Sequence, residues 1–247
     1  MADGSQAPHP VPVRRRLAAW GVHLLTASGA VIAFLSLLAV FEGEPAQALL
    51  WLCLSLLVDG LDGPLARRVR IRDSVPGIDG AALDLIVDFL TYVFVPAAIL
   101  WRFGMLPDPL ALPLIALVLL SSLHLFAKTD MKAADNHFVG FPAVWSGVVL
   151  VLFLLGTPPA LNAAVTVLLV VLTFAPLKAV HPFRVERWRA LTLVVTAAWG
   201  LSAVALLWLH PARPGWLLGI FVAGGLYLVA VSLWRTIADR GADRMAK

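Results

Sequence analysis

Four aspartates lie in two short stretches of an otherwise apolar region. VDGLDGPLAR carries Asp59 and Asp62, and GAALDLIVDFL carries Asp84 and Asp88. On a helix, residues three or four apart share one face, so two facing helices would bring four carboxylates into one cavity. Such a group cannot stay fully ionised without cations, and hard oxygen ligands select Mg²⁺, Mn²⁺ or Ca²⁺ over Zn²⁺. The spacing therefore predicts a divalent-metal site.

The composition indicates that these aspartates belong to a membrane protein. Of the 247 residues, 60% are hydrophobic and 14% are charged, with a mean hydropathy of +0.88. Soluble domains contain roughly 45–50% apolar residues, and apolar runs recur here from Leu17 to Trp234. The single cysteine, Cys53, excludes a disulfide framework and a cysteine metal cluster. Basic residues are spread over the loops and form no patch, so nucleic acid is not expected as a partner.

The elements that must position the aspartates are membrane helices. Segments of about 20 mostly apolar residues, separated at Gly, Pro and charge clusters, predict an all-α polytopic bundle of about eight transmembrane helices. The expected spans are 17–41, 46–66, 80–101, 110–127, 141–156, 160–178, 190–209 and 215–234. Residues 1–13 are expected to form a flexible tail and 14–247 a single transmembrane domain.

The distribution of positive charge predicts the orientation of this bundle. If eight helices alternate and the N-terminus is cytoplasmic, all 19 Lys and Arg residues except Arg102 and Arg213 fall on the cytoplasmic side. Cytoplasmic loops of membrane proteins carry such an excess. We therefore expect both termini, and the ends of the second and third spans that carry the aspartates, to face the cytoplasm.

An alternative role for the aspartates is a set of interfacial salt bridges to Arg67, Arg68, Arg70 and Arg72. A carboxylate costs roughly 2.5 to 3.5 kcal/mol at the centre of a membrane helix, and ionisable residues in spans are usually functional. We therefore favour the metal site. Arg67 follows Gly63 by four residues and so shares its helix face, one turn nearer the cytoplasm, where a guanidinium can hold a diphosphate through two hydrogen bonds.

The aspartate region also carries a family resemblance. The run from Asp59 to Asp88 reads D-x2-D-G-x2-A-R-x12-G-x3-D-x3-D. It resembles the signature of the CDP-alcohol phosphotransferases, membrane enzymes that transfer a phosphatidyl or related group to an alcohol and release CMP. The 12-residue gap before Gly80 and the wording DGLDGPLAR are similar to bacterial phosphatidylcholine synthases. The similarity extends through HLLTASG at 23–29, TYV at 91–93, GFPAVW at 140–145 and HPFRV at 181–185.

The resemblance implies roles for the signature residues. Asp59, Asp62 and Asp84 would ligate a two-metal centre of Mn²⁺ or Mg²⁺, and Asp88 would complete it and act as the base toward the incoming hydroxyl. The nucleotide and its diphosphate would be bound by Asp62, Gly63, Ala66, Arg67 and Gly80. Within the long gap, Asp73 and Asp79 are expected to be solvated loop charges.

The reaction that the resemblance implies is transfer from CDP-diacylglycerol to choline, which yields phosphatidylcholine and CMP. A carboxylate is a weak base for an alcohol, so we expect the metal to assist deprotonation in one direct displacement. No Ser, Cys or His arrangement suggests a covalent intermediate. Interfacial or packing roles are expected for the scattered histidines His23, His124, His137, His181 and His210.

Choline carries a quaternary ammonium, which aromatic faces and a nearby carboxylate can bind. The candidates at the expected cytoplasmic ends are Tyr92, Phe141, Trp145 and Glu186. Each aromatic residue could instead be an ordinary interfacial anchor.

The resemblance also implies a homodimer in the bacterial inner membrane, with membrane lipids as partners and the active site facing the cytoplasm. Two other functions stay open. The acceptor could be serine, glycerol phosphate or an inositol phosphate, or the aspartates could bind coupling cations in a transporter. No second half of the sequence echoes the aspartate motif, which disfavours the transporter.

Overall fold

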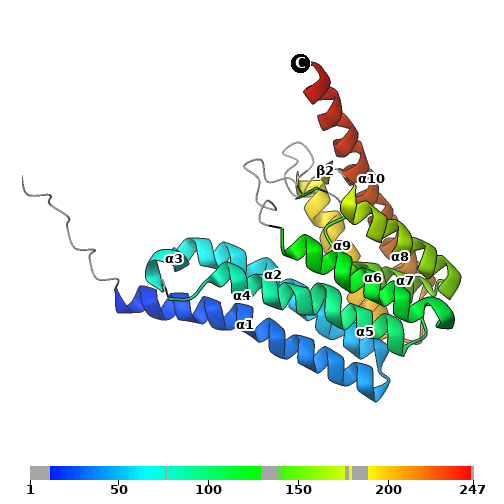
Figure 1. Ribbon diagram of the computed structural model, residues 1–247, viewed down its shortest axis with the longest axis horizontal. Helices are drawn as coiled ribbons and strands as arrows, with labels where there is room; N and C mark the ends of the chain where they lie inside the picture. The colour runs from blue at the N-terminus through cyan, green and yellow to red at the C-terminus, as the bar shows by residue number, and fades with distance from the viewer. Residues whose placement is uncertain are drawn as a thin grey trace, which may run out of the picture.

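The computed structural model describes residues 12–75, 77–128, 138–139, 141–175, 178–179 and 189–245. These residues are almost entirely helical (Figure 1), which confirms the predicted all-α class. Most of the expected N-terminal tail lies outside the described residues, and the first helix begins at Val13.

The described residues form eight helical rods in sequence order. The third rod has three parts, α4, the π-helix η1 and α5. The rods are α1 (Val13–Glu42), α2 (Pro45–Val69), α4 (Gly80–Asp88) with η1 (Phe89–Phe94) and α5 (Val95–Arg102), α6 (Asp108–Phe126), α7 (Trp145–Leu155), α8 (Pro159–Phe174), α9 (Arg189–Trp208) and α10 (Gly215–Met245). One short helix, α3 (Ile71–Ser74), follows α2, and a small antiparallel pair joins β1 (Phe138–Val139) to β2 (Lys178–Ala179).

Six of the rods in the described chain are long and apolar enough to cross a membrane, so this is a multi-pass membrane protein. They are Val13–Glu42, Pro45–Val69, Gly80–Arg102, Asp108–Phe126, Ala190–Trp208 and Gly215–Ser232. The apolar helices α7 and α8, with 11 and 16 residues, are shorter than the usual span. They coincide with the fifth and sixth predicted segments.

The start of the fifth helix differs from the prediction. We expected it at residue 141, but α7 begins at Trp145. Pro142 disfavours helical backbone at the preceding Phe141, and Ala143 has a positive φ of 55°. The N–H of Phe141 instead donates to the carbonyl of Leu172 at 3.1 Å, so an extended segment leads into α7 beside the end of α8.

Short turns join the helices at one end of the bundle. They comprise residues 43–44, 103–107, 156–158 and 209–214. Of the two basic residues expected on this side, Arg102 ends α5 and Arg213 lies in the 209–214 turn, with its guanidinium near the C-terminus of α7. The guanidinium of Arg213 donates to the carbonyl of Phe153 at 3.4 Å, and Nη2 of Arg102 lies 3.5 Å from the position of a Cβ at Gly43, which follows α1. A cation stabilises this end of a helix, which explains why both residues stand there.

The buried apolar core occupies the short-turn half of the bundle. It combines the end of α1, the start of α2, and α5, α6, α7, α9 and α10, with Leu49, Leu52, Ile99, Leu106 and Phe221 among its most buried members. The aspartates lie beyond this core, in the other half of α2 and at the start of the third rod. The core in the short-turn half therefore fixes the positions of α2 and the third rod, whose opposite ends carry the aspartates.

The third rod contains a wide turn between the aspartates and the core. In η1 the N–H of Val95 bonds to the carbonyl of Leu90, five residues earlier. Pro96 follows at once in α5 and has no N–H to donate, so the regular α-helical ladder cannot continue through this point. Such π-helical turns occur frequently at functional sites.

Candidate active site

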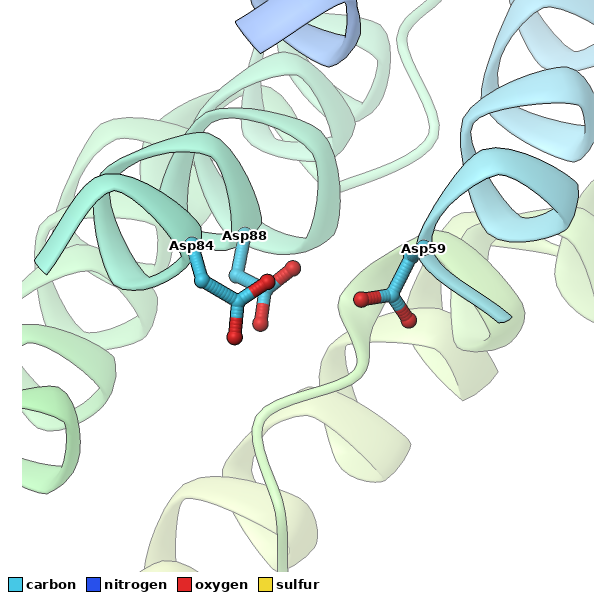
Figure 2. Close-up of side chains that lie close together, drawn as sticks. All are labelled: Asp59, Asp84 and Asp88. Carbon is cyan, nitrogen blue, oxygen red and sulfur yellow. The ribbon is translucent and has the colours of Figure 1, made fainter. Parts of the chain in front are cut away.

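Three of the four aspartates meet between α2 and α4. Asp84 and Asp88 project side by side from α4, and Asp59 points toward them from α2 (Figure 2). One carboxylate oxygen of each residue lies within 4.8 Å of the other two. The four-residue spacing on α4 thus places two acids on one face, as predicted, and the facing helix supplies the third.

This arrangement fits a divalent cation of the hard type. Oxygen ligands lie about 2.0–2.6 Å from Mg²⁺ or Ca²⁺, so two ligands of one ion are no more than about 4–5 Å apart. The three oxygens satisfy that limit. The adjoining crevice of about 10 Å³ is lined by all four aspartates, Asp59, Asp62, Asp84 and Asp88. The donor set contains only oxygen, which suits Mg²⁺ or Mn²⁺ and disfavours softer metals.

Tyr92 orients Asp59. Its hydroxyl donates to Oδ2 of Asp59 at 2.6 Å, reaching from η1 across to α2. The sequence analysis gave Tyr92 only as a choline candidate and did not predict this contact. Partners of this kind fix the orientation of metal ligands.

Asp62 has a separate partner on α1. The hydroxyl of Thr26 lies 2.6 Å from Oδ2 of Asp62 and donates to it. The Asp62 side chain is buried, with 7% of its surface exposed, and is not among the three residues whose oxygens converge. Asp62 still lines the crevice, and its role as a ligand of the two-metal centre stays a prediction.

One face of α1 completes the site, and the sequence analysis did not identify it. His23, Thr26 and Gly29 recur every third residue within HLLTASG and are all buried. A Cβ atom at Gly29 would overlap Cγ1 of Val87, so the missing side chain lets α1 approach α4 closely. The signal in the sequence was the three-residue period of polar and small residues inside an apolar span.

A cavity of about 1030 Å³ adjoins the carboxylates. Its walls include the signature residues Asp62, Gly63, Ala66, Arg67, Gly80 and Asp84. Nη1 of Arg67 lies 3.5 Å from the position of a Cβ at Gly63, so the guanidinium lies over the face of α2 that lacks side-chain bulk. The structure brings the expected nucleotide-binding residues together at one open space large enough for a nucleotide-sized ligand.

The two aspartates of the long gap are exposed, as expected of solvated charges, and each also has a partner. Asp79 precedes α4, and its Oδ1 accepts hydrogen bonds from the N–H groups of Ala81 and Ala82 at 3.0 and 3.2 Å. This is the usual way to cap a helix N-terminus. Asp73 is exposed and lies 3.5 Å from Nη2 of Arg15. Asp79 therefore fixes the start of the helix that carries Asp84 and Asp88.

The aromatic choline candidates belong to one cluster. Phe141 and Trp145 meet edge to face, with ring centroids 5.3 Å apart, and Tyr92 packs against the same group. Trp145 is fully buried, and its indole N–H donates to the hydroxyl of Ser122 at 3.0 Å. Trp145 therefore packs the cluster from inside, while Tyr92 links it to Asp59. Glu186 lies outside the described residues.

The histidines divide into two groups. His124 contacts the ring of Phe174, and His210 that of Phe153, at 5.6 and 5.1 Å between centroids. These contacts agree with the expected packing roles. His23 instead lines the large cavity. His137 and His181 lie outside the described residues.

Comparisons with known proteins give the same family that the signature indicates. The family model described as CDP-alcohol phosphatidyltransferase matches residues 22–177. A phosphatidylcholine synthase of Pseudomonas aeruginosa is 44% identical over 90% of this chain and 93% of its own length. Proteins of the same name from Agrobacterium fabrum and Legionella pneumophila are 42% and 35% identical, covering 86% and 82% of this chain and 88% and 82% of their own. This chain is a member of the CDP-alcohol phosphatidyltransferase family.

Proposed function

We propose that this protein synthesises phosphatidylcholine from CDP-diacylglycerol and choline. The oxygen of choline forms a bond to the phosphorus that carries diacylglycerol, the bond from that phosphorus to the bridging oxygen of the diphosphate breaks, and CMP leaves. The observation that carries this proposal is the convergence of the signature aspartates on one crevice beside a nucleotide-sized cavity. The choice of acceptor rests on relatives named phosphatidylcholine synthase that match over most of both chains.

Within the cavity, the residues of α2 are proposed to bind the donor. Gly63 and Ala66 leave space for the cytidine, and Arg67 binds the diphosphate oxygens with its two-pronged guanidinium. Gly80 lies across the same cavity at the start of α4, and Asp62 lies on the boundary with the crevice. Bound by these residues, the diphosphate would lie between the cavity and the carboxylates.

Asp59, Asp62, Asp84 and Asp88 are proposed to hold divalent cations, Mn²⁺ or Mg²⁺, in a two-metal centre. Bound there, the cations would neutralise charge on the diphosphate and acidify the acceptor hydroxyl. Tyr92 and Thr26 hold Asp59 and Asp62 in place for this purpose.

Asp88 is proposed to take the proton of the choline hydroxyl on one of its carboxylate oxygens. Its position supports this role, because it lines the crevice deeper along the third rod than Asp84. No protein nucleophile is required, since the acceptor oxygen attacks the phosphorus directly.

Choline is proposed to bind beside this crevice, with Tyr92, Phe141, Trp145 and Glu186 as the candidate residues. The support is strongest for Tyr92, which touches both Asp59 and the aromatic cluster. Trp145 would act by fixing the ring of Phe141, since its own ring is fully buried.

We further propose that the protein is a homodimer in the bacterial inner membrane, with both termini and the active site on the cytoplasmic side. The excess of Lys and Arg at the site end of the helices supports this orientation. The dimer is an expectation from the family, and an exposed stripe on α10 with open space at Gly215 and Gly219 is compatible with helix contact.

The test is an assay with the purified full-length protein in detergent, CDP-diacylglycerol and Mn²⁺. Choline, serine, glycerol phosphate and inositol phosphate are compared as acceptors, and CMP and the lipid product are measured. We expect choline-dependent CMP release that EDTA abolishes and excess Mn²⁺ restores. CMP release only with serine or a phosphorylated acceptor would refute choline as the acceptor. If none of the alcohols in the panel causes CMP release, the proposed function is refuted.

A further inference from the structure

The imidazole of His23 on α1 is buried without a partner for one of its nitrogens. Only 5% of the residue is exposed, and Nε2 has no hydrogen-bond partner among the described residues. A buried polar atom without a hydrogen bond costs about 1–3 kcal/mol, and such atoms are rare in native structures. Because His23 lines the large cavity, a ligand in that cavity could supply the missing partner.

The ring is held by its neighbours. Its Cε1 and Nδ1 atoms lie 3.1 and 3.6 Å from the position that a Cβ at Gly80 would occupy, and its edge meets the ring of Trp20 at 6.3 Å between centroids. The imidazole thus occupies the space left free by the signature glycine. A ring held in this way loses little conformational freedom when a ligand binds.

The position of His23 indicates which part of a ligand it would meet. Thr26, Asp62 and Asp84 line both the carboxylate crevice and the large cavity, so they mark the boundary between the two spaces. His23 is one helical turn from Thr26 and lines the large cavity only. It therefore lies on the nucleotide side of that boundary and away from the converging acids.

We propose that Nε2 of His23 hydrogen-bonds to the cytidine of the CDP-linked lipid, as a substrate-binding residue outside the eight-residue signature. A neutral imidazole nitrogen can donate or accept, and the cytosine edge and the ribose hydroxyls offer both kinds of partner. The inference rests on the donor half of the proposed function and is independent of the choice of acceptor.

Three substitutions separate this hydrogen bond from packing. Leucine at position 23 keeps an apolar side chain and removes the nitrogen. Glutamine carries its amide near the position of Nε2, whereas asparagine reaches only that of Nδ1. His124→Leu is the matched control, because His124 contacts Phe174 outside the cavity. Each purified variant is tested for CMP binding by calorimetry, for inhibition by CMP and by pyrophosphate, and for the KM of CDP-diacylglycerol.

For His23→Leu we expect the Kd of CMP and the KM of CDP-diacylglycerol to rise about five- to tenfold, the worth of one neutral hydrogen bond. The kcat and the inhibition by pyrophosphate should change less than twofold. Gln should restore most of the CMP affinity and Asn should not. Unchanged CMP affinity in His23→Leu, or equal weakening of CMP and pyrophosphate, overturns the inference.

If His23→Leu does not yield folded protein, the Gln and Asn variants decide the question, and equal CMP affinities for the two refute it. Calorimetry with CMP needs no acceptor. A protein that binds CMP through His23 but does not use choline would therefore refute the proposed acceptor and leave this inference intact.

Discussion

Gly29→Ala is expected to disable the enzyme without touching the substrate. The added Cβ would overlap Cγ1 of Val87, and carbon atoms in ordinary contact are about 3.5–4.0 Å apart. Helices α1 and α4 must therefore move apart by about 1 Å. This shift moves Thr26 on α1, and with it the hydrogen bond to Asp62, relative to Asp84 and Asp88.

The effect on the rate should exceed the effect on stability. A misplacement of about 1 Å can cost on the order of 100-fold in rate. Overpacking costs about 1–3 kcal/mol, but replacing a helical glycine by alanine returns up to about 1 kcal/mol. We expect kcat/KM to fall about 100-fold in the CMP-release assay, while thermal unfolding followed in detergent shows that the variant stays folded.

Two further variants test the contact itself. Val87→Ala removes the Cγ1 atom, so the Gly29→Ala/Val87→Ala double variant should recover at least tenfold of the lost rate. Gly21→Ala is the matched control on α1, because open space surrounds a Cβ there, and its rate should stay within twofold. A Gly29→Ala enzyme with more than half the normal rate, or a double variant as slow as the single, would refute the reasoning.

Three other substitutions probe the carboxylates and their surroundings. Asp84→Asn should lower turnover at least about 1000-fold and weaken Mn²⁺ binding while the protein stays folded. Asp108→Asn is the control. Near-normal activity of Asp84→Asn would show that Asp84 is not part of the metal centre. Tyr92→Phe should raise the Mn²⁺ concentration for half-maximal activity about 10- to 100-fold, and an unchanged value would show that Tyr92 does not position Asp59. Arg67→Ala should raise the KM of CDP-diacylglycerol and the inhibition constants of CMP and pyrophosphate together by at least tenfold, whereas unchanged constants would contradict diphosphate binding.

Much of the fold was predictable because the local composition of a sequence indicates where its membrane helices lie. Hydropathy and the Gly, Pro and charge breaks located all eight helical segments, most of them within a few residues. The start of α7 was missed because Phe141 and Pro142 continue the apolar run, although their backbone is extended. Hydropathy reflects how apolar a segment is and does not distinguish helical from extended backbone.

The site was predictable only in part. Helical spacing predicted that Asp84 and Asp88 share a face, and they do. It also predicted one face for Asp59 and Asp62, but residues three apart differ by about 60° around a helix axis. That angle suffices for Asp59 to meet Tyr92 and for Asp62 to meet Thr26. Which neighbour each acid finds depends on how α1, α2 and α4 pack, and the spacing within one helix carries no information about this.

The wide turn of η1 determines how the two ends of the third rod are rotated relative to each other. Each residue of an α-helix advances the side-chain direction by about 100°. If the segment Phe89–Phe94 were one residue shorter and regularly α-helical, α4 would be rotated by roughly that angle relative to α5. Ala97, Ile99 and Leu100 could keep their positions in the core, yet Asp84 and Asp88 would swing away from Asp59. The length of this one segment, rather than any contact it makes with substrate, sets the direction in which both acids point.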